Sequence, residues 1–545
     1  MEERLLLLKE EGGGIKEEVK RLGWVAAPMV AVNTCQYLLQ SSALTMVGHL
    51  GEFSLAATAL AVSITAVTGF SLVVGMASGI ETLCGQAYGA QQYQKLGTKT
   101  YTAILSLTLS CFPISILWFN LHSLLILTGQ DPLISHEARR YAICLIPSLF
   151  AFATLQPVVR FLQAQSLIMP MVLSSFLALT LHLPLCWVLV FKTEMGSIGA
   201  AVATAVSTWF NVAFLCLYVK FSKACERTRS PITVEVLSGV GEFFRFALPS
   251  AGMICLEWWS FEAMILISGL LPNPALETSV LSVCLTTIGT LYALPAGVGA
   301  AASTRVSNEL GAGNPDRART AVYGAMMIAS IEGITTSSVL FMCRRGLGYL
   351  FSDEKEVVDY VIQMAPFVSI SIVLDSLQGA FSGIVRGSGR QHIAVGGVLG
   401  TYYFVGIPTA ILLAFKFKLE GKGLWIGIQS GTFLQALVFA LVTITTNWKI
   451  QARKARERLH KGGFEVTSHD NKEKDFFQFL LSSIDKIKYF QVDSQLISKV
   501  VLSQFLLIEN VTDYDISEYI SNLILNLVEI KHDILFLNII SKEIN

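Results

Sequence analysis

Apolar stretches long enough to cross a lipid bilayer recur along the first 450 residues of this chain. The hydrocarbon layer of a membrane is about 30 Å thick, and an α-helix of about 20 apolar residues crosses it. Their length and frequency predict an all-α integral membrane protein. Twelve spans are expected, at residues 24–47, 54–80, 101–127, 141–165, 171–192, 197–221, 243–271, 279–303, 319–343, 357–385, 393–416 and 421–447.

Composition supports this class and argues against others. Of 545 residues, 53% are hydrophobic and only 15% are charged, which does not suit a water-facing surface. Lys and Arg balance Asp and Glu at 40 each, so a polybasic nucleic-acid binder is not expected. The ten cysteines include no C-x-x-C pair, and no metal site is predicted. No phosphate-binding loop motif occurs, so ATP-driven pumping by this chain alone is not expected. An enzyme is not predicted.

The distribution of positive charge predicts the orientation of the spans. Five Lys and Arg residues precede residue 24, and six more lie between residues 448 and 461. Because cytoplasmic segments retain an excess of positive charge, both ends are expected in the cytoplasm. The predicted order is a cytoplasmic N-terminus (1–23), six helices (24–221), a cytoplasmic linker (222–242), six further helices (243–447) and a basic cytoplasmic segment (448–463).

An internal repeat relates the two sets of six helices. Matches recur at an offset of 221 to 224 residues and include Pro28 with Pro249, Thr82 with Thr304, Gly89 with Gly311, Gln156 with Gln378, and Pro184 with Pro408. Six spans per repeat keep the same orientation, so the repeat is parallel. The sequence therefore predicts two pseudo-symmetric lobes, an N-lobe of helices 1–6 and a C-lobe of helices 7–12.

Residues 464–545 differ in composition from the rest of the chain. They contain no Ala, Gly, Pro, Arg, Met, Cys or Trp and are rich in Ile, Leu, Lys, Asn, Asp and Phe. The missing residues are mostly those with GC-rich codons, which favours translated non-coding sequence, a gene-model artefact. The alternative is a regulatory amphipathic tail around Leu496 to Leu507. That segment is too short to span a bilayer.

Acidic side chains inside the spans are the first functional candidates, because burying a charge in a membrane is costly. Glu257 in helix 7 and Asp375 in helix 10 are predicted to exchange protons. The repeat places the neutral residues Gln36 and Ala153 at the equivalent positions of the N-lobe. Basic candidates such as Arg386 lie near helix ends and are not expected to pair with these acids permanently. Desolvation disfavours a carboxylate, so a buried acid can hold a proton at one face and release it at the other.

Two further acids and a set of polar and aromatic side chains complete the predicted cavity. Glu262 and Glu332 are possible proton-binding or cavity acids. Aromatic faces attract organic cations and stack on flat rings. The residues expected to line the substrate cavity are Gln36, Tyr37, Gln40, Trp258, Trp259, Phe261, Tyr292 and Gln378.

A third group of polar residues lies toward the expected cytoplasmic ends of helices 2 and 8. Arg305 and Glu309 are one helical turn apart and are expected to form an exposed pair that helps to close this side. Glu81 and Glu309 are expected where water can reach them. The predicted cytoplasmic gate comprises Glu81, Gln86, Arg305, Asn308 and Glu309.

Several long motifs in this order resemble the plant branch of the multidrug and toxic compound extrusion (MATE) family, the DETOXIFICATION proteins. They are Met46-Val-Gly-His-Leu-Gly, Glu81-Thr-Leu-Cys-Gly-Gln-Ala-Tyr-Gly-Ala, Cys255-Leu-Glu-Trp-Trp-Ser-Phe-Glu, Pro272-Asn-Pro and Arg305-Val-Ser-Asn-Glu-Leu-Gly-Ala-Gly-Asn-Pro. The resemblance covers residues 24–461. It implies a two-lobe antiporter in the plasma or vacuolar membrane that expels organic cations, xenobiotics or secondary metabolites in exchange for protons, with no cofactor.

The resemblance also bears on the coupling residues. Family members are reported to use a helix-7 glutamate and a helix-10 aspartate, which correspond here to Glu257 and Asp375. Many prokaryotic members carry an aspartate in helix 1, where this chain has Asn33 and Gln36, so an N-lobe ion site is not expected. Two other functions stay open. A lipid or lipid-linked glycan flippase would present basic cavity walls to a phosphate, and a membrane receptor or scaffold would need no buried titratable pair.

Overall fold

The computed structural model describes residues 14–351 and 354–461. It divides into two compact units, residues 1–122 with 132–464, and residues 123–131 with 465–545. Of the second unit only residues 123–131 are described, and they contain the end of the short helix α6 (Leu121–Leu127). All other helices of the described residues belong to the first unit. The composition-based interpretation of 464–545 lies outside the described residues.

Twelve helices in the described part of the chain are long and apolar enough to cross a membrane, which confirms the expected all-α membrane fold. Each is longer than the roughly 20 residues that a bilayer requires. The first begins at Ile15, nine residues before the expected boundary. In order they are α2 (Ile15–Gly48), α3–η1–α4 (Glu52–Gly89), α5 (Tyr93–Phe119), α7 (Pro132–Ala164), α8 (Met169–Phe191), α9 (Ser197–Phe221), α11 (Val240–Ser268), α12–α13 (Pro274–Ala312), α14 (Pro315–Phe351), α15 (Lys355–Ser388), α16–η3–α17–η4 (Gln391–Lys416) and α18 (Glu420–Ile444).

Three of the spans depart from regular α-helical geometry. The second contains a π-helical turn, η1 (Ala66–Phe70), between α3 (Glu52–Thr65) and α4 (Ser71–Gly89). The eighth is divided at Tyr292 into α12 (Pro274–Leu291) and α13 (Ala293–Ala312). The eleventh alternates between α16 (Gln391–Leu399), η3 (Gly400–Gly406), α17 (Ile407–Ile411) and η4 (Leu412–Lys416). Such irregularities often mark functional positions in helices.

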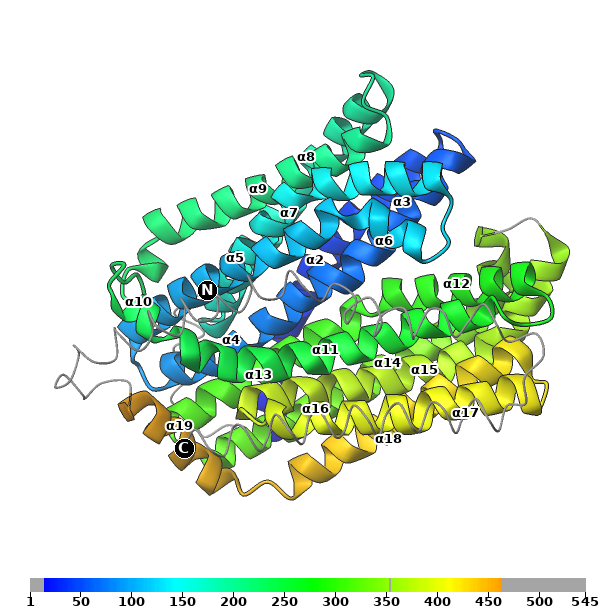
Figure 1. The fold of residues 1–545 in the computed structure, drawn as a ribbon. Helices are drawn as coiled ribbons and strands as arrows, with labels where there is room; N and C mark the ends of the chain where they lie inside the picture. The colour runs from blue at the N-terminus through cyan, green and yellow to red at the C-terminus, as the bar shows by residue number, and fades with distance from the viewer. Residues whose placement is uncertain (1–13, 352–353, 462–545) are drawn as a thin grey trace, which may run out of the picture. The chain divides into compact units, whose positions relative to one another are not determined.

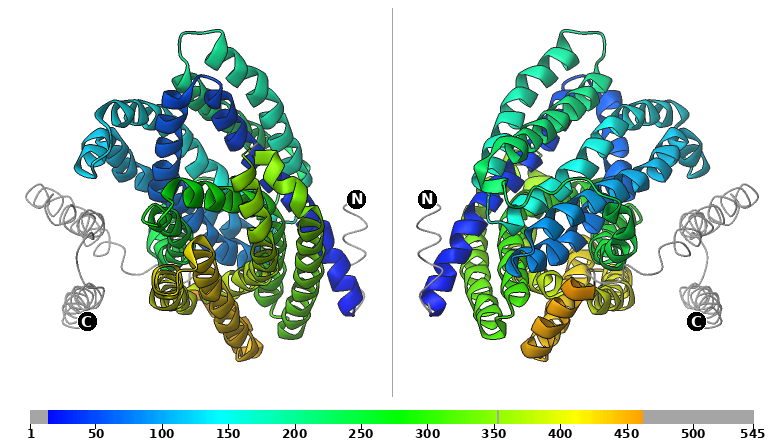
Figure 2. Two further views of the ribbon diagram at one scale, coloured as in Figure 1. Left: turned by 90° about the vertical axis from the view of Figure 1, so that its right-hand side faces the viewer. Right: turned by 90° about the vertical axis from the view of Figure 1, so that its left-hand side faces the viewer.

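The helices form the two predicted lobes, α2–α9 and α11–α18 (Figure 1). Helix α4 packs against α11, and α13 packs against α2. These two contacts are equivalent under the repeat, because α2 corresponds to α11 and α4 corresponds to α13. Figure 2 shows the dark-blue α2 beside green helices of the second lobe, in agreement with its contacts to α13 and α14. Each lobe thus supplies the same two helices to the interface.

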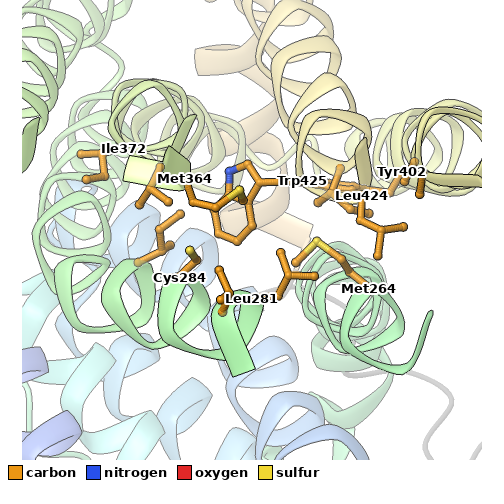
Figure 3. Close-up of a cluster of buried hydrophobic side chains, with 14 of the residues drawn as sticks. Met264, Leu281, Cys284, Met364, Ile372, Tyr402, Leu424 and Trp425 are labelled. Carbon is orange, nitrogen blue, oxygen red and sulfur yellow. The ribbon is translucent and has the colours of Figure 1, made fainter. Parts of the chain in front are cut away.

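Apolar side chains fill the interior of the second lobe (Figure 3). Met264, Leu281, Met364 and Leu424 from four different helices are all nearly inaccessible to solvent. Trp425 lies among them and donates its indole N–H to the Ser371 hydroxyl at 3.0 Å. This single polar link satisfies a donor that burial would otherwise leave unpaired.

Besides α6, two shorter α-helices in the described part of the chain lie outside the spans. Helix α10 (Glu235–Ser238) lies in the linker between the lobes. Helix α19 (Trp448–Lys461) follows the last span, and it contacts α4 of the first lobe as well as α13 and α14 of the second. Ala452, Ala455 and Leu459 are its buried residues, whereas Arg453 and Lys454 are exposed. Residues 448–461 of the predicted basic segment therefore form an amphipathic helix that contacts both lobes.

Candidate functional site

Glu257 lies near the middle of α11, 17 residues after its beginning and 11 before its end. Its Oε2 atom accepts hydrogen bonds from Gln378 Nε2 on α15 at 2.9 Å and from Gln435 Nε2 on α18 at 3.1 Å. The side chain is only partly buried. Two neutral amides therefore hold a membrane-embedded carboxylate in place without neutralising its charge.

Asp375 lies on α15, one helical turn before Gln378, and is 7% exposed. Its carboxyl group lies within electrostatic range of Glu257. Asp375 and Tyr292 line the same small cavity of about 10 Å³, together with Ile288, Leu291, Pro295 and Ile372. That volume is close to what one water molecule occupies. The structure thus brings together the two acids that the sequence singled out.

The break in the eighth span explains how Tyr292 reaches this cavity. Pro295 has no backbone N–H and cannot donate to the carbonyl of residue 291, so the regular helix ends there. Tyr292 occupies the junction, and its phenol lies within electrostatic range of both Glu257 and Asp375. A polar ring is therefore placed beside the two carboxyl groups by a proline-induced interruption.

The other two predicted acids have separate surroundings. Glu262 is partly buried on α11, and its Oε2 atom accepts a hydrogen bond from Ser63 on α3 at 3.1 Å, across the two lobes. Glu332 on α14 accepts a long hydrogen bond from Thr336 at 3.4 Å and lies within electrostatic range of Asp375. Glu332 thus borders the carboxyl pair, whereas Glu262 lies at the contact between the lobes.

Some of the aromatic candidates are partly exposed, and others contact neighbouring helices. Trp258 and Trp259 are each 37% exposed, and the indole N–H of Trp259 donates to the Val67 carbonyl at 3.1 Å. Tyr37 on α2 accepts a hydrogen bond from Thr290 on α12 at 3.1 Å. Phe261 instead stacks at a tilt on the buried Tyr402, with ring centroids 6.2 Å apart.

The remaining two cavity candidates lie near Tyr37 on α2. Gln36 is partly buried, and Gln40 is exposed. Tyr37, Trp259 and Glu262 all make contacts between α2–α9 and α11–α18, whereas Gln378 is bonded to Glu257.

Glu81 corrects one expectation from the sequence. It is 5% exposed and therefore not reached by water as predicted. Its carboxylate lies between two guanidinium groups, 3.2 Å from Arg160 Nε on α7 and 3.2 Å from Arg386 Nε on α15. Arg386 also donates to the Ser382 hydroxyl at 2.7 Å, one turn back along its helix. Arg386 lies near the end of α15, as expected, and its long side chain extends back into the interior.

Arg305 and Glu309 also differ from the prediction. Glu309 is 7% exposed, so the pair is not at a solvated surface. Arg305 Nη2 donates to Glu309 Oε1 at 2.8 Å and to Glu18 Oε2 on α2 at 3.0 Å, and Arg305 Nε donates to Glu18 Oε1 at 2.7 Å. Asn314 donates to the second oxygen of Glu309 at 3.3 Å. The sequence predicted a weak, exposed pair on one helix. The structure instead shows a buried network that joins the two lobes.

The last two gate candidates lie where α4 and α13 meet. The Asn308 amide donates to the Ala164 carbonyl at 3.0 Å, and Gln86 Oε1 accepts from Arg458 on α19 at 3.2 Å. A Cβ atom added at Gly311 would lie 2.2 Å from the Gln86 carbonyl oxygen. Only glycine permits backbones to approach this closely.

Helix α19 reinforces this junction from outside the spans. Arg458 lies over the Phe246 ring of α11 at 5.3 Å, and Arg456 donates to the Ala312 carbonyl at 3.2 Å. Lys95 of α5 donates to the Leu459 carbonyl. Burial, and to a smaller extent the neighbouring Arg245, lowers the pKa of Arg458, so its contacts with Gln86 and Phe246 support a charge in an unfavourable place.

Several residues of this site were missed by sequence reasoning. Arg160 lies inside the span 141–165. A positive charge inside a span marks a functional candidate as clearly as an acid does. Gln435 stands alone in an apolar run and gave a weaker signal. Glu18 falls within the segment expected to precede the first span, so nothing in the sequence marked it. Its role follows from the extension of α2 back to Ile15.

Twelve spans in two related lobes, with polar groups gathered at mid-depth, define a membrane transporter. A family model, MatE, matches residues 28–188 and 249–412, one stretch in each lobe. The chain belongs to the MATE family of transporters and is not an enzyme.

Comparison with known proteins supports this assignment. Protein DETOXIFICATION 14 of Arabidopsis thaliana is 57% identical over 452 residues, which cover 83% of this chain and 93% of that protein. Protein DETOXIFICATION 12 of the same plant is 54% identical over 447 residues, covering 82% and 93%. The crystal structure of the eukaryotic MATE transporter AtDTX14 matches 82% of this chain and 100% of that chain, with a TM-score of 0.79 and 57% identity.

A more distant structure shares the fold alone. It is the outward-facing conformation of a multidrug resistance MATE family transporter of the MOP superfamily, at 18% identity and a TM-score of 0.71. It covers 82% of this chain and 97% of that chain. The expected family and fold are thus confirmed.

Proposed function

We propose that this transporter exports organic cations, xenobiotics or secondary metabolites from the cytosol in exchange for protons. The observation that carries the proposal is the placement of Glu257 and Asp375 near the middle of their helices. Two amides hold Glu257, and Asp375 borders a small cavity of about 10 Å³. Ionisable groups at this depth are typical of proton pathways.

The chemistry of the carboxyl pair supports exchange. A carboxylate accepts either a proton or a cation, and the two compete for the same oxygen atoms. Because Gln378 and Gln435 carry no charge, they orient Glu257 without blocking this competition, unlike a permanent arginine partner. Binding of a proton then favours release of the cation, and binding of the cation favours release of the proton.

Aromatic side chains near this depth suit organic substrates. Trp258 and Trp259 are on the helix that carries Glu257, one and two residues further along, and each exposes more than a third of its surface. Tyr292 lies beside the carboxyl pair. Faces of aromatic rings attract desolvated cations by about 2 kcal/mol or more. The names of the relatives, DETOXIFICATION and multidrug resistance, agree with a broad substrate range.

Contacts between the lobes support a state closed toward the expected cytoplasmic side. The ion pairs Glu18–Arg305, Glu81–Arg386 and Lys99–Glu242 all join α2–α9 to α11–α18 in the halves of the spans assigned to that side. With α19 they form a layer that must open for substrate to enter from the cytosol. Alternating access would then require these pairs to break and re-form.

The direct test is uptake of a panel of fluorescent cations into everted membrane vesicles that contain the protein. A pH gradient with the vesicle interior acidic should drive accumulation. A sodium gradient with the higher concentration inside, at equal pH on both sides, should not. Accumulation driven by sodium alone would contradict proton coupling. Mock vesicles with an equal gradient provide the background.

The other functions predict different outcomes. A flippase would move a fluorescent phospholipid between leaflets, and a receptor or scaffold would show no flux. The residues that line the cavity beside Asp375 include no Arg or Lys, which does not favour a phosphate headgroup, and Arg160 and Arg386 are held against Glu81 between the lobes. Imaging of a fluorescent fusion in plant cells would distinguish the plasma membrane from the vacuolar membrane, the two locations that we propose.

A further inference from the structure

A stripe of polar side chains runs along one face of α15. Asp375, Gln378, Ser382 and Arg386 are three or four residues apart, which places them on the same side of a helix. The first three are buried, and the Arg386 side chain is only 13% exposed. The stripe therefore leads through the interior from the middle of α15 to its C-terminal end.

The two ends of the stripe contact different functional groups. At one end Gln378 donates to Glu257 of the carboxyl pair. At the other end Arg386 donates to Glu81, which belongs to the opposite lobe. Ser382 accepts a hydrogen bond from Arg386 and holds its guanidinium group along the stripe. One helix face thus joins the proposed proton site to an ion pair between the lobes.

The charges around Glu81 do not balance. Arg160 and Arg386 each lie 3.2 Å from this single carboxylate, which leaves one positive charge in excess. Arg386 also lies within electrostatic range of Glu257. Charges act over longer distances in a protein interior than in water. An ionised Glu257 therefore supplies the negative charge that the cluster lacks.

Other ionisable groups face the same region. They are Asp375 on α15, Glu332 on α14, and the phenols of Tyr292 between α12 and α13 and of Tyr402 on η3. Like charges this close oppose each other, so neighbouring carboxyl groups tend to retain a proton between them. During transport, Arg386 therefore experiences the gain or loss of one negative charge at the neighbouring carboxyl groups around Glu257.

The first lobe has no equivalent route. At an offset of 222 residues, the four stripe positions correspond to Ala153, Gln156, Arg160 and Ala164 of α7. The acid and the terminal arginine are both replaced by alanine. The connection between a carboxyl pair and the lobe interface is therefore built into the second lobe alone.

We propose that Arg386 is a positioning residue that couples the charge of Glu257 to the Arg386–Glu81 ion pair between the lobes. The inference rests on the proposed function. When Glu257 is ionised and empty, the cluster is balanced and the ion pair holds the lobes together. When Glu257 binds a proton or a substrate cation, its charge no longer offsets the repulsion between Arg386 and Arg160 across the lobes, and the Arg386–Glu81 pair weakens. Only the loaded transporter then changes its orientation, which is the condition for exchange without leakage.

Hydrogen–deuterium exchange tests this coupling in the full-length protein. Residues 82–92 and 303–313, where α4 and α13 meet, report on opening between the lobes. Exchange is measured below and above the pH of half-maximal transport in the wild type, Glu257→Gln and Arg386→Gln. Comparison at each pH removes the intrinsic pH dependence of amide exchange. Two further variants keep the test interpretable if Arg386→Gln misfolds. Arg386→Lys keeps the charge, and Ser382→Ala removes only the hydroxyl group that accepts from Arg386.

The expected results separate the inference from the proposed function. The wild type should open about tenfold more at low pH, which corresponds to about 1.4 kcal/mol. Glu257→Gln and Arg386→Gln should both remove this dependence, and Arg386→Lys should restore part of it. If Arg386→Gln and Ser382→Ala keep the wild-type pH response while Glu257→Gln loses it, the coupling role of Arg386 is wrong and the proton site stands. If Glu257→Gln also keeps the response, the proposed function fails.

Discussion

Arg305 on α13 binds both carboxylate oxygens of Glu18 on α2, at 2.7 and 3.0 Å, and so joins the two lobes through a bidentate ion pair. The same guanidinium group contacts Glu309 at 2.8 Å. A buried charge that loses its partner is costly, whereas an exposed pair adds little. This difference separates the network from the weak surface pair that the sequence suggested.

Arg305→Ala should therefore lower stability strongly, by about 3–5 kcal/mol, because two buried carboxylates lose their shared cation. Thermal inactivation of the detergent-solubilised protein measures the loss. Arg317→Ala provides the matched control, since Arg317 is exposed on the neighbouring helix α14. Equal inactivation temperatures for the two variants would show that the network does not stabilise this state.

Glu309→Gln should leave proton-driven efflux in place. Arg305 retains two contacts with Glu18, so the network is weakened but not removed. Efflux in everted vesicles measures the effect at several imposed pH gradients. Loss of proton coupling with unchanged substrate binding would instead make Glu309 the coupling acid.

Truncation should separate α19 from the residues that follow it. A chain ending after residue 461 retains every described span and all contacts of α19, and it should insert and transport like the full-length protein. A chain ending after residue 447 loses the contacts of Arg456 with Ala312 and of Arg458 with Gln86, and it should transport poorly. Equal transport by both truncated proteins would argue against a role for α19.

A methyl group at Gly311 should disturb the contact between α4 and α13. Its Cβ would lie 2.2 Å from a backbone oxygen, so the helices must move apart. We expect Gly311→Ala to destabilise the protein by about 1–3 kcal/mol. Gly346→Ala is the control, because a Cβ there meets no atom within 4 Å. Alanine at such a helical position should be neutral or stabilising, by up to about 1 kcal/mol.

The membrane fold was predictable because lipid admits few solutions. A bilayer requires long apolar helices, and these are visible in the sequence. The positions of Glu257 and Asp375 inside spans were predictable for the same reason, since acids are rare there, and their role in coupling stays a prediction. The structure adds the neutral partners Gln378 and Gln435 and the cavity beside Tyr292.

The pairing of charges between lobes was not predictable. Glu81 and Arg386 are 305 residues apart, and their contact depends on how α4 and α15 pack. Arg386 was placed at a helix end by its position in the sequence, but its long side chain extends toward the interior to Ser382. Glu18 lies before the apolar run that defined the first span. Tertiary packing, and not local pattern, decides each of these contacts.

The central claim is that Glu257 and Asp375 carry the exchanged proton. One pH unit supplies about 1.4 kcal/mol per proton, and 100 mV adds about 2.3 kcal/mol per charge, but only a group that changes protonation can use this energy. Glu257→Gln and Asp375→Asn keep size and hydrogen bonding and cannot titrate. Ala153→Asp should not rescue Asp375→Asn, because Gln36 in the first lobe provides no acidic partner.

The most direct measurement is substrate-induced proton movement in proteoliposomes that contain a trapped pH-sensitive dye. When a transported cation is added outside, its entry through the wild-type protein should be accompanied by exit of protons. The internal pH should therefore rise. Glu257→Gln and Asp375→Asn, inserted at equal density and of wild-type stability, should each abolish this proton movement. Wild-type proton movement in the double variant would contradict the account and would transfer the coupling role to Glu262 or Glu332.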